Sequence, residues 1–155
     1  MINDKYVVGE DEFDSNLEED LRVNPANLND EFATHSEKFA WYATAYELAK
    51  DYEMQLKARV ERLYAQLDYI VREEGRLAGI KLTEKKVENS VITRDDYVRL
   101  YDLYIEAQKN TGLLRAARDA MIHKKDMLIS MGANYRAEGA SDLSMKMDQY
   151  RQLKK

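Results

Sequence analysis

Residues 28–74 decide the fold, and they read LNDEFATHSEKFAWYATAYELAKDYEMQLKARVERLYAQLDYIVREE. These 47 residues contain neither glycine nor proline, and as an α-helix they would form a rod about 70 Å long. Apolar and aromatic side chains recur at alternating spacings of four and three, the pattern of a helix that buries one narrow seam. The seam positions are Leu28, Phe32, His35, Phe39, Tyr42, Tyr46, Ala49, Glu53, Leu56, Val60, Leu63, Leu67 and Ile70.

A second long helix is predicted over residues 94–136, after a break that begins at Gly75 and Gly79. Its apolar residues recur with the 3.6-residue period of an amphipathic helix. Two helices of similar length with a short connection fold back on each other. We therefore expect an all-α fold, with a long antiparallel helical hairpin over residues 27–138. Because two helices make a thin core, we also expect a homo-oligomer formed by coiled-coil or bundle packing.

The connection and the two ends of the chain give further expectations. Thr83 is expected to start a short helical turn that runs to Val87. Residues 139–155 are expected to form a separate short amphipathic C-terminal helix. Residues 1–26 are expected to be an acidic, partly disordered leader, because residues 1–31 carry ten acidic and two basic side chains. This leader is either a solvated tail, an arm that docks a partner, or an arm that competes with an anionic ligand.

Several classes of function are not expected. The chain has no cysteine, so disulfides and thiolate chemistry are excluded and a cytoplasmic location is expected. No apolar run is long enough to span a membrane, so no membrane partner is expected. The two histidines, His35 and His123, are not paired with a Glu-x-x-His motif, and no phosphate-binding loop is present. We therefore predict neither an enzyme nor a metal or cofactor site.

Basic side chains suggest a different role, because residues 32–155 carry a net charge of +3. One group surrounds the predicted turn, and a second group lies on the returning helix. Spaced Lys and Arg residues bind phosphate backbones, and tyrosines can stack on single-stranded bases. The candidate nucleic-acid-binding residues are Arg59, Arg62, Arg72, Arg76, Lys81, Lys85, Lys86, Arg115, Arg118, Lys124 and Lys125.

An alternative interpretation treats the same cations as structural. If Arg59, Arg62 and Arg72 pair along the hairpin with acidic side chains, no continuous positive face exists. The acidic partners expected in that case are Asp102, Asp119 and Asp126. The protein would then be a non-catalytic coiled-coil structural, scaffolding or assembly protein without nucleic-acid binding.

The order of a few motifs resembles a known family. The motifs are Trp41, then Ala65-Gln-Leu67-Asp68-x-x-x-Arg72, then Thr83-Glu-x-x-Val87-Glu88-x-x-Val91 before the second helix. This order is similar to that of the phage recombination mediator family (UvsY-like). The resemblance implies a phage-encoded protein of the host cell cytoplasm that forms ring-like homo-oligomers and binds single-stranded DNA. It would promote the loading of a RecA-like recombinase onto strands covered by single-strand binding protein.

The chain departs from this family at one motif. The basic residues that precede Leu-Asp in the family correspond here to Tyr64 and Gln66. Either Arg62 and Arg72, one turn away on each side, replace those contacts, or DNA binding is weaker than in the family. The long acidic leader is a second departure.

Overall fold

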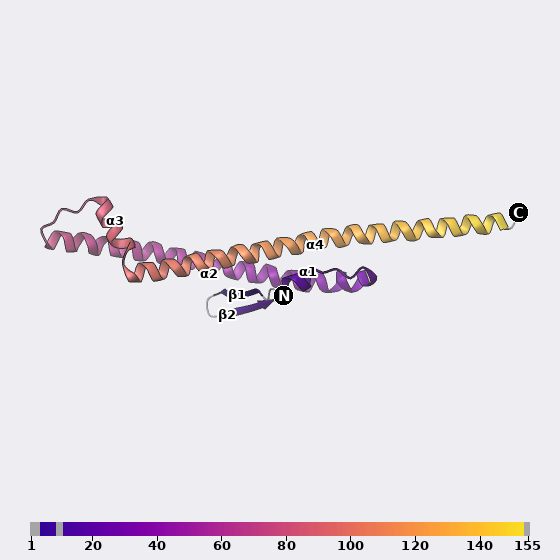
Figure 1. Cartoon of the computed structure of the whole chain (residues 1–155), viewed down its shortest axis with the longest axis horizontal. Coiled ribbons are helices and arrows are strands. Elements are labelled where there is room, and N and C mark those ends of the chain that lie inside the picture. The colour runs from indigo at the N-terminus through magenta and orange to yellow at the C-terminus, as the bar shows by residue number, and fades with distance from the viewer. Residues whose placement is uncertain (1–3, 9–10, 154–155) are drawn as a thin grey trace.

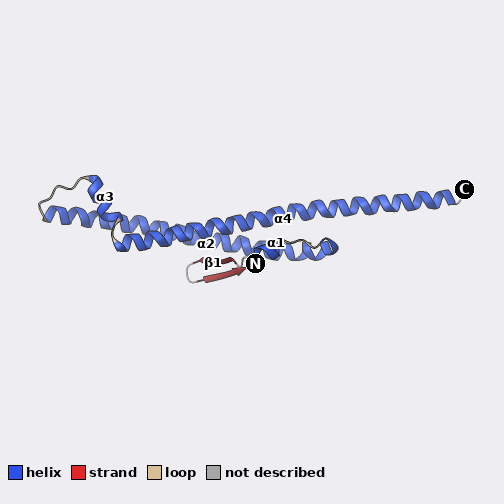
Figure 2. Cartoon of the chain, in the orientation of Figure 1, coloured by secondary structure: helices blue, strands red, loops and turns tan. Residues whose placement is uncertain are grey.

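The protein is a long antiparallel helical hairpin with a small N-terminal β-hairpin laid against it (Figure 1). The computed structural model describes residues 4–8 and 11–153. Helices account for most of the chain, as the colouring of Figure 2 shows. The elements in order are β1 (Asp4–Val8), β2 (Asp11–Ser15), α1 (Leu17–Leu21), the 3-10 turn η1 (Pro25–Asn27), α2 (Leu28–Leu77), α3 (Glu84–Ile92) and α4 (Asp95–Leu153). The predicted all-α hairpin is confirmed.

The core lies between α2 and α4. Ala45 and Ala49 of α2 pack against Leu114 of α4. One turn further, Tyr42 packs against Ala117 and Met121. The alanines let the two backbones approach closely, and the larger side chains fill the space on either side.

The predicted seam of α2 is correct over its middle and wrong near both ends. Phe32 and Ile70 are 40% and 41% exposed, although both were seam positions. After Leu67 the buried positions are Val71 and Gly75, so the spacing changes from alternating four and three to successive fours. Steps of four rotate the buried stripe around the helix. The last turns of α2 therefore face α3.

The turn end of the hairpin is closed by an apolar cluster. Leu67 and Val71 of α2 pack against Val87 and Val91 of α3, and all four side chains are buried. Thr83 caps α3, since its Oγ1 accepts a hydrogen bond from the backbone N–H of Lys86. The predicted helical turn after Thr83 is present and continues to Ile92, past the expected end.

Two glycines shape the chain as it leaves α2. Gly79 has a φ of +67°, in the left-handed region that favours glycine. Gly75 is buried, and a Cβ placed there would lie 2.7 Å from Cδ1 of Leu82. The connection can therefore fold tightly over the end of α2, which brings α3 back onto it.

The expected separate C-terminal helix is wrong. α4 continues without interruption through Gly132 and Gly139 to Leu153. A glycine inside a helix costs only about 1 kcal/mol relative to alanine, and no proline follows to break the helix. Since Tyr135 lies beside Pro25, just before α2 begins, the rest of α4 extends past the hairpin as a single helix (Figure 1).

The leader has more structure than expected. β1 and β2 pair antiparallel, with Asp4 opposite Ser15 and Val8 opposite Asp11. These strands were not predicted from the sequence. After them, α1 and η1 lead directly into α2. Residues 1–3 and 9–10, which belong to the predicted leader, lie outside the described residues.

Candidate nucleic-acid interface

The cations predicted from the sequence do not form one surface. Around the turn, Arg72 binds Asp68 at 2.8 Å and Glu84 at 2.6 Å. These two hydrogen-bonded carboxylates raise the pKa of Arg72 above its ordinary value. Arg76 likewise pairs with Glu73 at 2.8 Å. Both guanidinium groups are therefore largely neutralised by neighbouring acidic side chains.

Three lysines at the same end are different. Lys81, Lys85 and Lys86 are exposed, and none of them forms an ion pair with a described residue. Lys81 precedes α3, and the other two lie in its first turn. They are the cations of the turn end that remain available to an anionic ligand.

Lys124 does not belong to a solvent-facing interface, which corrects its assignment as a phosphate contact. Its side chain is only 3% exposed. The Nζ atom donates to the carbonyl oxygens of Asp20 and Arg22 at 2.8 and 2.9 Å, and to Oε2 of Glu31 at 2.8 Å. Three acceptors satisfy all three ammonium protons. The sequence carried a signal for this burial, because Lys124 is spaced three from Met121 and four from Leu128, both of which are buried.

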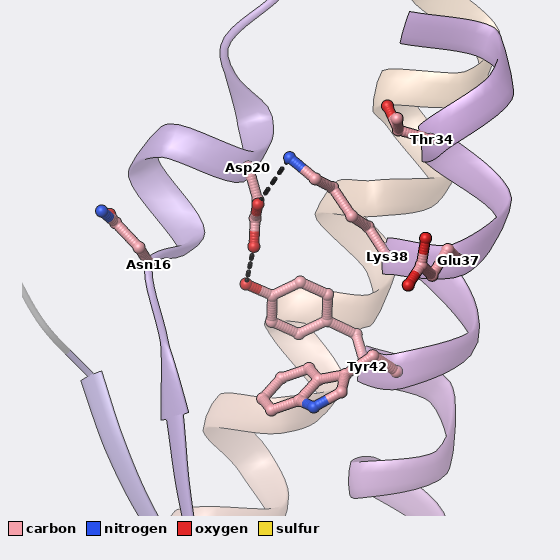
Figure 3. Close-up of a pocket in the computed structure, with 7 residues that line it drawn as sticks. Asn16, Asp20, Thr34, Glu37, Lys38 and Tyr42 are labelled. Atoms are coloured by element: carbon pink, nitrogen blue, oxygen red, sulfur yellow. Dashed lines mark hydrogen bonds and ion pairs between the residues drawn. The ribbon is translucent and has the colours of Figure 1, made fainter. Parts of the chain in front are cut away.

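Residues 16–27, which we call the leader strap, lie over one side of the hairpin. Leu17 and Leu21 of the strap pack against the cluster that contains Tyr42 and Met121. Asp20 lies between Lys38 and Tyr42, accepting from Lys38 Nζ at 2.7 Å and from the Tyr42 hydroxyl at 2.9 Å (Figure 3). We call this side of the hairpin the covered flank.

A surface pocket of about 370 Å³ lies where the strap meets α2. Asn16 and Asp20 border it from the strap, and Lys38 borders it from α2 (Figure 3). Trp41 of α2 also lines it. The Asp20 carboxylate in this pocket is already engaged by Lys38 and Tyr42. The pocket therefore presents no free anionic centre from the strap.

Arg59 and Arg62 lie on the covered flank of α2. About five full helical turns separate Trp41 from Arg59, so the two share one side of the helix. Arg59 is exposed, and the Nε atom of Arg62 donates to the backbone carbonyl of Ala58 at 3.1 Å. The strap lies on the same side nearer the start of α2.

The other side of the hairpin carries a row of tyrosines. Tyr64 of α2 meets Tyr97 of α4 edge to face, with ring centroids 6.0 Å apart. Tyr97 and Tyr101 stack at 5.8 Å, and Tyr101 and Tyr104 follow at 6.1 Å. Burial raises the pKa of Tyr97, while Tyr101 is 41% exposed. The row is thus anchored in the core at one ring and open to solvent at the next.

Cations continue this row along α4. Arg115 and Arg118 follow Tyr104 at spacings that keep them on the same side of the helix. The Arg118 guanidinium lies 4.4 Å from the centre of the Tyr46 ring of α2. We define the open flank by Tyr46, Tyr64, Tyr97, Tyr101, Tyr104, Arg115 and Arg118.

The charge of the open flank is mixed but positive. Asp119 pairs with Arg118 at 2.7 Å and lies 4.0 Å from Arg115. Three lysines at matching helical spacings add positive charge to this side. They are Lys50, whose Nζ lies 3.9 Å from Oε2 of Glu47, Lys57 and Lys125. Lys125 is exposed and pairs with Asp126 at 3.2 Å, and Lys57 is exposed without an ion pair to any described residue.

The pairings expected for a purely structural role are not the ones formed. Asp119 and Asp126 bind cations of their own helix, and Arg72 binds Asp68 and Glu84. The tyrosines of α4 were not predicted from the sequence as a unit. Their spacing of four and three, at positions 97, 101 and 104, was the available signal.

Within the described ranges, no group of three or more His, Asp or Glu residues is placed to hold a metal ion. Among those residues no helix combines the length and the apolar character that crossing a bilayer requires. No protein-family model, no curated protein and no solved structure matches this chain.

Proposed function

We propose that this protein binds single-stranded DNA along the open flank and acts as a recombination mediator of the phage type. In this role it promotes the loading of a RecA-like recombinase in competition with single-strand binding protein. The observation that carries the proposal is the alignment of the tyrosine row with Arg115 and Arg118 on one side of the hairpin. The order of motifs around Trp41, Leu67-Asp68 and Val87 supports the same role.

The chemistry of the open flank suits a single strand better than a duplex. Stacking on aromatic rings needs unpaired bases, and each stacked base contributes about 1–3 kcal/mol without strong sequence preference. Tyr101 offers the exposed ring, and the arginines further along offer charge to the phosphates. From Tyr97 to Arg118 the row is about 30 Å long, a length that suits several nucleotides.

The turn end extends this surface. Lys81, Lys85 and Lys86 are exposed cations close to α3, and α3 packs against Tyr64 and Tyr97 at the start of the row. A strand that leaves the tyrosines can therefore meet further positive charge. Arg72 and Arg76 contribute less, because their carboxylate partners would have to be displaced.

The proposed mechanism is non-catalytic. The hairpin would hold DNA in an extended form. This form would lower the affinity of single-strand binding protein for the strand and provide a site at which recombinase filaments nucleate. A ring-like homo-oligomer would present several open flanks to one strand and raise the overall affinity through multivalency. The acidic strap, with Glu18 and Glu19 exposed, offers a contact for the basic channel of either partner protein.

The experiment is fluorescence anisotropy of a labelled single-stranded oligonucleotide at two salt concentrations. The variant Lys57→Glu/Arg115→Glu reverses two charges of the open flank, and Arg59→Glu/Arg62→Glu reverses two charges of the covered flank. We expect the first variant to lose affinity and to show a shallower salt dependence, while the second keeps both. Equal losses in the two variants, or no binding by the unmodified protein at low salt, would contradict the proposal.

The tyrosines require a separate variant. Tyr101→Phe keeps the ring and Tyr101→Ala removes it. We expect Tyr101→Ala to weaken single-strand binding about tenfold without changing the salt slope. Tyr101→Phe should bind like the unmodified protein. A shallower slope in Tyr101→Ala would show that the ring acts through the charges and does not stack on bases.

The second candidate is a structural or assembly protein without nucleic-acid binding. One observation favours it: α4 extends past the hairpin and exposes Leu143, Met145 and Met147 at 65%, 57% and 58%. Most helical stability in proteins comes from packing of an amphipathic face, so contact with another chain would stabilise this extension. Absence of DNA binding from a protein shown to be oligomeric would favour this candidate.

A further inference from the structure

The leader strap is held mainly by polar contacts. Neither α1 nor η1 contains a buried residue. Only Leu17 and Leu21 pack into the hairpin core, and both are partly exposed. Segments with few buried apolar contacts open at low free-energy cost while the rest of a protein stays folded. The strap can therefore detach from the hairpin at low free-energy cost.

Lys124 is the central attachment point of the strap. Its ammonium binds two strap carbonyls, those of Asp20 and Arg22, and the carboxylate of Glu31 on α2. Glu31 in turn accepts from the backbone N–H of Asn24 in the strap at 2.9 Å. One buried charge thus joins the strap, α2 and α4. Without that charge, two carbonyls and a carboxylate would lose their partner in a site that excludes water.

His35 lies in the same region and is 8% exposed. Its Nδ1 atom is buried without a hydrogen-bond partner among the described residues. Burial lowers the pKa of His35, and the charges of Lys124 and Lys125 on α4 lower it further, while Glu31 on its own helix acts in the opposite direction. Phe39 stacks against the ring at 6.3 Å and offers no acceptor. The closed arrangement therefore favours the neutral imidazole.

We propose that the leader strap is a detachable cover of the hairpin, closed by the charged Lys124 ammonium and opened when His35 takes up a proton. A proton on His35 adds a positive charge that Lys124 and Lys125 both oppose, while Glu31 acts in the other direction. Opening the strap admits water to this site. It also uncovers the side chains under the strap, among them Tyr42 and Met121. The hairpin itself keeps its apolar contacts along α2, α3 and α4.

The direction of the pH effect follows from the lowered pKa. Between that pKa and the ordinary value of about 6.5, His35 is protonated in the open form and neutral in the closed form. The closed form is therefore most favoured above about pH 6.5 and loses stability as the pH falls below that value. Glu31 adds no opening in this window, because its own pKa is held below the ordinary carboxylate value.

Trp41 provides the measurement, because it is the single tryptophan of the chain and borders the pocket beside the strap. Acrylamide quenching of Trp41 fluorescence is recorded on the full chain from about pH 7.5 to about pH 5, together with helical circular dichroism. We expect quenching to rise as the pH falls, while the helical signal stays constant. Unchanged quenching, or loss of both signals together, would overturn the proposal.

Matched variants identify the groups responsible. His35→Gln should remove the pH dependence, while His123→Gln, which changes an exposed histidine, should leave it intact. Lys124→Met should show high quenching already at neutral pH, while Lys125→Met should keep the low quenching of the unmodified protein at neutral pH. A pH response that persists in His35→Gln would overturn the role of this histidine.

A variant in the strap itself tests the same proposal if Lys124→Met fails to fold. Asp20→Ala removes the acceptor of Lys38 and of the Tyr42 hydroxyl, and it leaves the apolar side chains of the hairpin core unchanged. It should raise Trp41 quenching at neutral pH and keep the full helical signal. A closed strap in Asp20→Ala and in a folded Lys124→Met would show that the polar contacts do not hold it.

Discussion

The two ends of the hairpin are closed by different chemistry. At the turn, α3 is held by the apolar cluster of Leu67, Val71, Val87 and Val91. At the other end, the strap is held by the ammonium of Lys124 and by hydrogen bonds to Asp20. Apolar burial is non-directional and insensitive to pH, whereas a buried charge depends on every partner it has. The turn is thus built to stay closed, and the strap is built to respond to its surroundings.

The largest effect on stability is expected from the apolar cluster. Leu67→Ala removes a side chain that is 3% exposed and leaves a cavity between α2 and α3. Such a change costs about 2–5 kcal/mol in the free energy of unfolding. Urea denaturation followed by helical circular dichroism measures this loss. Trp41 quenching at neutral pH should stay unchanged, and a rise would show that the two ends of the hairpin are coupled.

The next effect is expected from the carboxylate that faces Lys124. Hydrogen bonds from Lys124 and from the backbone of Asn24 lower the pKa of Glu31. Its contribution to stability is therefore complete above about pH 4.5 and is lost as the pH falls below that value. Glu31→Gln should cost about 1.5–3 kcal/mol at neutral pH, the usual worth of a hydrogen bond to a charged group.

The pH profile provides the check on Glu31. Urea midpoints of the unmodified protein should fall between about pH 5 and pH 3. The difference between that protein and Glu31→Gln should narrow over the same interval, because protonation has the same effect as the substitution. A difference that stays constant with pH would show that Glu31 contributes through packing and not through its charge.

Periodicity explains how much of this fold the sequence could predict. The alternating spacing of four and three in α2 and the 3.6-residue period of the second helix both involve residues close together in the chain. Both long helices could therefore be predicted, and their antiparallel packing followed from the short connection between them. The strap did not follow, because Lys124 reaches Asp20 across 104 positions of the chain. The spacing of residues along a helix does not determine which backbone carbonyls a buried lysine binds in a distant segment. The same lysine was counted as a surface cation for this reason.

Only part of the candidate interface could be predicted, because its contacts also depend on residues that are distant in the sequence. Counting charges selected cations such as Arg72 and Arg76, but it could not show that Asp68, Glu84 and Glu73 engage them. The tyrosine row of α4 could have been predicted from its helical spacing. Its contact with Tyr64 of α2 depended on the register between the two helices.

A smaller effect is expected at the turn, where backbone conformation is tested. Gly79→Ala places a Cβ at a φ of +67° and should cost about 1 kcal/mol. Gly112→Ala is the matched control, since that glycine lies inside α4 with no atom within 4 Å of the added Cβ. It should stabilise the protein by about 1 kcal/mol through helix propensity. Equal effects of the two changes on the thermal midpoint would show that the turn carries no conformational requirement.

The smallest effect is expected from the exposed ion pairs that join α2 to α3. Arg72→Lys keeps the charge but loses the planar group that binds Asp68 and Glu84 together. Because the three side chains are solvated, the thermal midpoint should move very little, and added salt should reduce even that shift. A large loss of stability in Arg72→Lys would mean that the turn also depends on charge. The contrast between an apolar turn and a polar strap would then fail, since both ends of the hairpin would respond to ionic strength in the same way.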